Sequence, residues 1–569
     1  DRAERGGLLA DLAAVAAEAR AIEDARGDSS SSSAAEAAPR ASALEGESAR
    51  AFASLVRLGV SASAFASAAL RSVPDAGAVR SLVRVASSRA RPEAQRRAAA
   101  FAIAAGCRAR SREGGAGGGA GANRSQNQHS HATRRAFAKA ATARGAIAAL
   151  RDLVAEDDAA PRTVSAALDA LAALLGDASS HDPEAGSPGG GYAEAPRKHV
   201  ARLMVDERLV PAVVAALDPA RPGTVLNVEA AERSVRRVSS SSARLDASSS
   251  SDASLVALHA SRLLRLPFDE PLPPPGASGD EAEAALRRYQ ETLLNEAVVA
   301  SVVQALDALT QSAARDTSHF TTGEESAPTT PGGGERRAMY SSSTPPSDVR
   351  VSGAAALTGV LSQLVLRSPS YAKQFVDAGG VAPALLRRTL HPTLNAPSAL
   401  IDALLAVSQL ARLGAEHYPA IKRADAVGLV APLLSHRDAG VRARACNALG
   451  NMCRHSGFFY DDFADRGALT GLIERCGDSD RTTRKFACFA IGNAGFHGDR
   501  LYAHLAEAAA PLTALLRDEE EKTRANAAAA LGNLVRNSDA LCSDLIRAGA
   551  LEALVELATG GYDAGAGGA

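Results

Sequence analysis

Tryptophan is absent from this sequence, and phenylalanine and tyrosine together fill only 4% of its positions. Hydrophobic residues still make up 46% of the chain, in runs dominated by Ala and Leu with few β-branched stretches. Ala and Leu have high helix propensity, whereas strands are enriched in β-branched and aromatic residues. The composition therefore predicts an all-α protein.

Neither sign of charge is in excess, because Lys and Arg number 63 against 64 for Asp and Glu. No overall positive field would attract nucleic acid or an anionic membrane surface. No apolar run approaches the roughly 20 residues that a bilayer-spanning helix needs. We therefore expect neither a nucleic-acid partner nor insertion into a membrane.

Cysteine is also sparse: six residues are scattered singly, without a CxxC pair, and no signal peptide is recognisable. This pattern is typical of a reducing compartment and predicts a cytoplasmic protein. The sequence starts at Asp1 rather than Met. We expect it to be a fragment or an incomplete gene model with further residues upstream.

What the sequence does contain is a repeat. Gly-Asn recurs at positions 450/451, 492/493 and 532/533, at intervals of 42 and 40 residues, and each Asn follows an Arg by nine positions. An apolar run of the form GALxxLxxL precedes each of these segments, and nine such runs begin near residues 75, 143, 206, 295, 378, 425, 466, 508 and 547. This period is typical of armadillo-type helical repeats. We predict an armadillo/HEAT-like α-solenoid of about eight to nine repeats.

The upstream copies are more divergent and more widely spaced, because segments rich in Gly, Ser and Pro interrupt them. Such segments cannot bury enough apolar surface to order themselves, so we predict disordered insertions that leave one solenoid. The predicted organisation is an Ala-rich helix with a Ser-rich linker at 1–45, divergent repeats at 46–315, an insertion at 316–349, regular repeats at 350–558 and a tail at 559–569.

In the second helix of each regular copy, one face beside the packed stripe carries amides. The predicted partner-binding groove comprises Gln409, Arg444, Asn447, Asn451, Phe486, Phe489, Asn493, Asn526 and Asn533. A side-chain amide can bond both the C=O and the N–H of an extended peptide. Alternatively, each amide bonds a backbone group of the adjacent helix and holds the repeats in register. Armadillo import receptors carry Trp four residues before the Asn, and this chain does not, so a nuclear-import groove is not expected.

Several chemical motifs are explained by the repeat instead. His436-Arg437-Asp438 spells the catalytic-loop tripeptide of kinases, but no lysine strand or Asp-Phe-Gly accompanies it. Asp438 lies four residues before Arg442, at the position of Asp480 in the next copy, which predicts a helix start. The Cys and His residues of the C-terminal copies recur with the repeat, and the glycine run at 114–121 lacks the Lys-Ser/Thr of a phosphate loop. We expect no catalytic residue, metal site, cofactor or small-molecule substrate.

The text RACNALGNMCRHSGFFYDDF, RTTRKFACFAIGNAGFHGDRLYAHL and KTRANAAAALGNLVRNSDALCSDLIRAGAL resembles the C-terminal repeat region of Fused-type serine/threonine kinases, most closely the plant member of that family. The resemblance is strong over 441–557 and weak before residue 351. In that family a kinase domain precedes the repeats, and none of its motifs is present here.

The resemblance implies a noncatalytic scaffold that binds proteins. Family members act in cytokinesis through kinesins of the phragmoplast, in assembly of the flagellar axoneme, or in Hedgehog signalling. Cytoskeletal or flagellar association and microtubule-associated partners such as kinesins are therefore expected. Two alternatives stay open: a free-standing scaffold without a kinase, and part of an active kinase whose catalytic domain lies upstream of residue 1.

Three candidate phosphorylation sites lie in the predicted insertions. Ser239 follows Arg236-Arg237-Val238, as for a basophilic kinase, and Thr330 and Thr344 each precede a proline. Phosphate at such a site adds charge without disrupting a core. The alternative is that these insertions are inert spacers.

Overall fold

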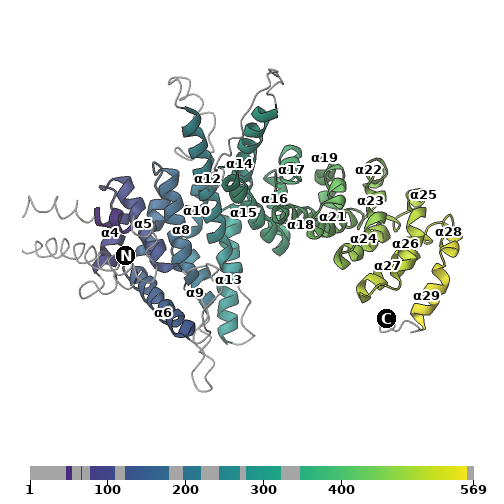
Figure 1. Ribbon diagram of the computed structural model, residues 1–569, viewed down its shortest axis with the longest axis horizontal. Helices are drawn as coiled ribbons and strands as arrows, with labels where there is room; N and C mark the ends of the chain where they lie inside the picture. Colours follow the sequence, from purple (N-terminus) through teal and green to yellow (C-terminus); the bar gives the residue numbers. More distant parts are fainter. Residues whose placement is uncertain are drawn as a thin grey trace, which may run out of the picture. The chain divides into compact units, whose positions relative to one another are not determined.

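The computed structural model describes residues 47–53, 66, 69, 77–108, 122–177, 196–219, 242–269, 277–321 and 346–559. Within these ranges every regular element is an α-helix or a short 3-10 helix, which confirms the all-α prediction (Figure 1). The chain divides into two compact units, Asp1–Ser301 with Ser341–Gly353 and Val302–Tyr340 with Ala354–Ala569.

In the first unit, α5 packs against α4 and α8, and α8 packs against α12. Small buried side chains such as Ala99 and Ala102 line these contacts together with Leu168 and Leu171. The helices are α4 (Gly77–Ser87), α5 (Glu93–Cys107), α6 (Ala122–Ala143), α7 (Ala146–Ala155), α8 (Pro161–Asp177), α9 (Pro196–Asp206), α10 (Leu209–Leu217), α12 (Ser242–Arg265), η1 (Leu266–Phe268) and α13 (Ala277–Asn295).

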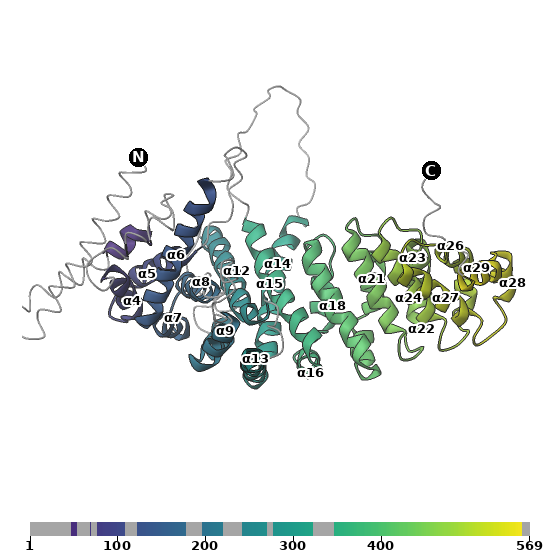
Figure 2. The same cartoon turned by 90° about the horizontal axis from the view of Figure 1, so that it is seen from below.

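The second unit holds the regular repeats, with four longer helices stacked in order: α18, α21, α24 and α27 (Figure 1 and Figure 2). Its helices are α16 (Pro369–Asp377), α17 (Pro383–Thr389), α18 (Pro397–Leu413), η2 (Ala415–His417), α19 (Tyr418–Arg423), α20 (Ala426–Val430), η3 (Ala431–Ser435), α21 (Ala439–Met452), α22 (Tyr460–Asp465), α23 (Ala468–Arg475), α24 (Arg481–Ala494), α25 (Tyr502–Leu505), η4 (Ala506–Ala508), α26 (Ala509–Leu515), α27 (Glu521–Leu534), α28 (Cys542–Arg547) and α29 (Ala550–Ala558). Two helices, α14 (Val298–Thr321) and α15 (Pro346–Arg367), each run from one unit into the other.

Each of the nine predicted apolar runs forms a helix, and these helices are α4, α7, α10, α14, α17, α20, α23, α26 and α29. In three copies the residue just before the helix is a glycine in the left-handed region: Gly145, Gly467 and Gly549 have φ of 79°, 66° and 73°. A left-handed residue reverses the chain between two short helices, and glycine adopts it without a steric penalty. The glycine of the GALxxLxxL run is thus explained by this turn.

Helices extend into three of the predicted insertions, the Gly-rich one from residue 111, the Ser-rich one from residue 239 and the one at 316–349. The helix α6 starts at Ala122, α12 starts at Ser242, and α14 and α15 reach Thr321 and Pro346. Polar side chains at the outer end of a helix cost little when the other end is anchored by packing. The predicted N-terminal helix at residues 8–22 and the tail at 560–569 lie outside the described residues.

Candidate protein-binding groove

The Gly-Asn pairs connect successive repeats. The amide nitrogen of Asn493 donates to the carbonyl oxygen of Gly450 at 2.8 Å, and that of Asn533 donates to Gly492 at 2.9 Å. A Cβ on Gly450 would lie 2.7 Å from the ring of Phe489, so only glycine permits this approach of α21 and α24. In the first two pairs the dipeptide therefore has a structural cause: its glycine admits the next helix, and its carbonyl accepts from the next asparagine. The glycine of the third pair has open space around its Cβ position.

The next copy upstream has Ser408 where the others have glycine. Asn451 there donates its amide to Ser408 Oγ at 2.9 Å, and the serine hydroxyl donates to Asn447 Oδ1 at 2.8 Å. Asn451 is buried, and Gln409 is also buried and accepts from Arg412 Nε at 2.9 Å. These two amides of the predicted groove lie beneath the surface, since packing of α18 against α21 covers them.

Ion pairs connect the N-terminal ends of the stacked helices. The guanidinium of Arg442 donates to both carboxylate oxygens of Asp478, at 2.7 and 2.8 Å, and Arg484 donates to Asp518 at 2.7 Å. Burial of Asp478 raises its pKa, but the hydrogen bond from Arg442, the Asp480 N–H and the nearby guanidinium charges outweigh burial and leave the pKa lowered. The hydrogen bond that Arg442 donates to Asp478 raises the pKa of Arg442. Both groups are therefore charged at neutral pH.

A tyrosine series connects the opposite ends of these helices. The Tyr418 hydroxyl donates to the Asn451 carbonyl at 3.0 Å and accepts from the His455 N–H at 3.1 Å. Tyr502 donates to the Asn533 carbonyl at 2.6 Å in the same way. Sequence reasoning missed these residues, although Tyr418, Tyr460 and Tyr502 recur at 42-residue intervals that could have revealed them.

Histidine residues recur at the same repeat interval as the tyrosines, near the same helix ends. His455 Nε2 donates to the carbonyl of Arg412 at 3.0 Å, and His497 Nε2 donates to that of Arg454 at 3.1 Å. Asn537 replaces histidine in the last of these copies and donates to the Phe496 carbonyl at 3.0 Å. Arg412, Arg454, Phe496 and, by the same offset, Arg536 thus occupy one repeat position.

The structure places the predicted groove residues on four adjacent helices. Those half-buried at the surface are Arg444, Asn447, Phe486, Phe489, Asn493, Asn526 and Asn533. The Arg444 guanidinium lies 6.0 Å from the ring centre of Phe486, and Asn526 donates to the Lys485 carbonyl at 3.1 Å. Within the described residues, the Oδ1 atoms of Asn493 and Asn533 accept no hydrogen bond. Each of these amides can therefore hold the register through nitrogen and still offer an acceptor at the surface.

The kinase-like tripeptide is part of a helix start, as predicted. Asp438 is the N-cap of α21, and its Oδ1 accepts from the Val441 N–H at 3.1 Å. His436 Nδ1 accepts from the Asp438 N–H at 3.0 Å, so both side chains serve the turn before the helix. Among the described residues, no group of His, Cys, Asp and Glu has the arrangement of a metal site.

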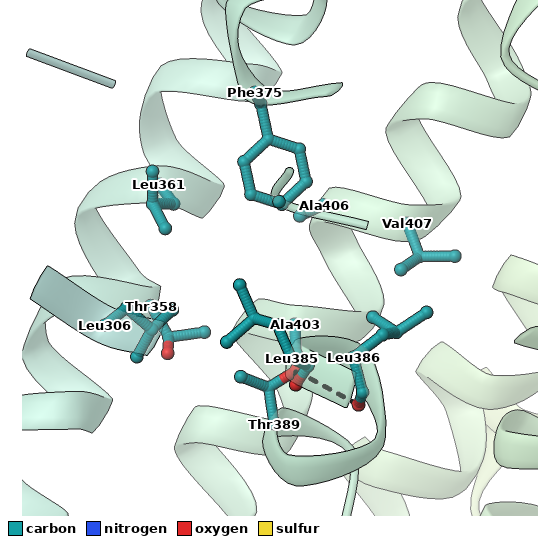
Figure 3. A pocket seen from close by; sticks show the side chains of 11 residues that line it. Leu306, Thr358, Leu361, Phe375, Leu385, Leu386, Thr389, Ala403, Ala406 and Val407 are labelled. Atoms are coloured by element: carbon teal, nitrogen blue, oxygen red, sulfur yellow. Dashed lines mark hydrogen bonds between the residues drawn. The ribbon is translucent and has the colours of Figure 1, made fainter. Parts of the chain in front are cut away.

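A small cavity lies between α15, α17 and α18 in the second unit (Figure 3). Its volume of about 20 Å³ is close to one water molecule. Its walls are mostly apolar, and its two hydroxyls, on Thr358 and Thr389, donate to carbonyls of their own helices at 2.9 and 3.1 Å. This is a packing void without free polar groups, too small for a substrate.

The candidate phosphorylation sites Ser239, Thr330 and Thr344 lie outside the described residues. Among the described helices, none by itself has the length and apolar character to cross a bilayer, although the bent pair Glu281–Asn295 and Val298–Ser312 meets both criteria together.

Residues 469–564 match the family described as HEAT repeats. The chain is 42% identical over 190 residues to serine/threonine-protein kinase TIO of Arabidopsis thaliana, an alignment that covers 33% of this chain and 14% of that protein. It is 32% identical over 217 residues to serine/threonine-protein kinase 36 of Mus musculus, covering 36% of this chain and 16% of the relative. The chain thus matches only about one seventh of the length of these relatives.

These relatives are Fused-type kinases, which confirms the resemblance stated from the sequence. The described part of this chain folds as helical repeats, so what it shares with them is a noncatalytic repeat region. Among solved structures, an engineered protein is 20% identical, covers 91% of both chains and has a TM-score of 0.52. That likeness concerns the fold alone and supports the helical-repeat architecture.

Proposed function

We propose that this chain is the noncatalytic repeat region of a Fused-type kinase and binds protein partners through the groove formed by α18, α21, α24 and α27. The observation that carries the proposal is that contacts between repeats and free surface side chains occupy different parts of these helices. The ion pairs and the tyrosine series join the repeats at the two helix ends. Between them, half-buried aromatic and amide side chains remain at the surface.

The exposed acceptors fit an extended peptide. Asn493 Oδ1 and Asn533 Oδ1 lie on neighbouring helices, and stacked helices are roughly 8–10 Å apart. A peptide laid across them presents backbone N–H groups that can donate to both oxygens. The half-buried rings of Phe486 and Phe489 add apolar surface on α24, on the side that faces α21. Backbone recognition of this kind binds a partner segment without reading every side chain.

The partners we propose are microtubule-associated proteins such as kinesins, in cytokinesis or in assembly of a flagellum. This part of the proposal is supported by the similarity to Fused-type kinases. A free-standing scaffold is the second candidate. A glycine-rich loop, a lysine strand and Asp-Phe-Gly in frame upstream of residue 1 in the coding sequence would favour the kinase, and an upstream stop codon would favour the scaffold.

The test compares variants that lose groove atoms with a variant that loses only repeat contacts. The variant Asn493→Ala with Asn533→Ala removes both acceptors and, because it also removes two hydrogen bonds, should cost about 2 kcal/mol of stability. The control Tyr502→Phe removes hydrogen bonds to Asn533 and Asn537 but leaves the groove side chains in place. Phe486→Ser changes the groove without removing a hydrogen bond.

The measurement is proximity labelling in dividing cells, with binding normalised to folded protein. We expect both groove variants to lose kinesins and other microtubule-associated proteins, while Tyr502→Phe retains them. Equal loss in all three variants would mean that the amides only hold the register. Unchanged labelling by the groove variants would remove this groove as the partner site.

A further inference from the structure

We infer that the groove selects an acidic partner segment in which carboxylates flank an apolar residue. The inference rests on the proposed function and adds the chemistry of the partner. Its basis is the arrangement of three arginines, Arg412, Arg444 and Arg536, around the aromatic side chains of α24 and of the turn that follows it.

Two of the three arginines touch a groove residue, and the third touches Phe496 in the turn that follows α24. Arg412 donates to Gln409, Arg444 lies over Phe486, and the Arg536 guanidinium lies 4.2 Å from the ring centre of Phe496. Within the described part of the chain, none of the three forms an ion pair. Groove arginines thus differ from Arg442 and Arg484 on the same stacked helices, which bond the carboxylates of the next repeat.

Stacking on a ring makes an arginine a better receptor for a carboxylate. A ring face holds the flat guanidinium by cation–π attraction, and the N–H groups at the edge of the guanidinium stay free. Those N–H groups form two parallel hydrogen bonds to a carboxylate. Less side-chain entropy is lost on binding, because the guanidinium is already positioned. Arg444 and Arg536 meet this description.

The order of side chains along the stacked helices determines how acidic and apolar residues should be spaced in the partner segment. Arg412 lies in the last turn of α18 and Arg444 lies on α21. The aromatic side chains come from α24 and its following turn, and Arg536 follows α27. Neighbouring helices lie roughly 8–10 Å apart and an extended chain advances about 3.3 Å per residue, so each repeat faces two or three residues. A matching segment has an apolar residue with carboxylates two to three positions away on both sides.

A protein segment fits this surface better than a nucleic acid. Carboxylates lie on the same stacked helices and in the loops that follow them: Asp402 on α18, and Asp499 and Asp539 in the loops after α24 and α27. The paired Asp478 and Asp518 line the opposite helix ends. A continuous chain of phosphates would be repelled by these groups, whereas a peptide with a few spaced carboxylates can avoid them.

The test is fluorescence anisotropy with the full chain and three labelled 12-residue peptides. All have a central Phe, and the other positions are Glu and Asp, Lys and Arg, or Gln and Ser. We expect the acidic peptide to bind at least ten-fold more tightly than the neutral one, and its affinity to fall as salt is raised. Arg444→Gln and Arg536→Gln should each weaken it several-fold. The control is Arg423→Gln, an exposed arginine at the end of the outer helix α19, which should have no effect.

Equal or tighter binding of the neutral or basic peptide would overturn the inference. If that binding also depends on Asn493 and Asn533, the proposed groove stands and only the acidic preference fails. Tighter binding of a single-stranded oligonucleotide that the same arginine variants abolish would overturn it in favour of nucleic acid. Absence of binding by every peptide would overturn it too, and the labelling experiment above then decides the proposed function separately.

Discussion

The ion pair between Arg442 and Asp478 predicts a large local loss of stability when one partner is removed. The side chain of Asp478 is 3% exposed and that of Arg442 is 13% exposed. Removing one member of a buried pair leaves an uncompensated charge, at a cost of about 3–5 kcal/mol. Arg442 has some contact with solvent, and Arg475 stays 3.5 Å from Asp478 in the variant, so we expect about 3 kcal/mol, the lower end of that range, for Arg442→Met.

Two further variants separate the pair from its surroundings. Arg442 also donates to the carbonyls of His436 and Arg437 at 3.0 and 3.2 Å, so Arg442→Lys keeps the charge but loses most of this geometry and should cost less than Arg442→Met. In the double variant with Asp478→Ser the buried carboxylate is gone as well, and Arg475, its second partner, keeps its pair with Glu474. The cost of the double variant should therefore be clearly smaller than the sum of the two single costs.

Hydrogen exchange measured by mass spectrometry on the full chain is the appropriate assay, because a repeat array opens locally rather than in one step. Peptides from α21 and α24 should lose protection in Arg442→Met, and those from the first unit should not. The exposed pair Arg466–Asp425, with side chains 51% and 44% exposed, is the control, and Arg466→Gln should cost no more than about 1 kcal/mol.

The same ion pair predicts that the stability of these repeats falls at low pH. The folded-state pKa of Asp478 is lowered from its ordinary value near 3.9, so the pair contributes fully above that pH and its contribution is lost as the pH falls through the folded pKa. This account of the ion pair would be refuted if protection of α21 and α24 were unchanged in Arg442→Met. It would also be refuted if the two single costs simply added in the double variant.

Three further predictions concern the repeat glycines, the thiols and the helix start. Gly450→Ala should destabilise by about 1–3 kcal/mol through overpacking against Phe489, whereas Gly532→Ala, with open space around its Cβ, should stabilise by about 0.5–1 kcal/mol in urea unfolding. Ellman's reagent should react quickly only with half-exposed Cys542 in the native chain. Burial raises the pKa of Cys446 to about 12, whereas a thiol in the unfolded chain ionises near pH 8.5, so the free energy of unfolding should fall as pH rises above about 8.5. Asp438→Asn should cost about 1 kcal/mol or less, and calorimetry should detect no Mg-ATP binding before or after the change.

The repeat architecture was readable from the sequence because it is encoded locally. Helix propensity, the apolar runs and the recurring Gly-Asn predicted a helix in each of nine copies, and each copy forms one. Asp438 was recognised as a helix start because an N-cap is a local feature: its side chain accepts a hydrogen bond from an N–H only three residues further along the chain. The starts of α6 and α12 were not predicted, since their first turns are polar and are helical only because they continue the packed parts of the same helices.

Only the tertiary structure decided what each amide does. From the sequence, Asn451, Asn493 and Asn533 are equivalent, yet Asn451 is buried on Ser408 while the other two keep a surface oxygen. The carboxylate partners and the tyrosine series likewise depend on atoms more than 30 residues apart along the chain coming within about 3 Å. Local patterns determine which face of a helix is apolar, but contacts between helices depend on how closely two backbones approach, and here that distance is set by a glycine on one helix and by the side chains of the next.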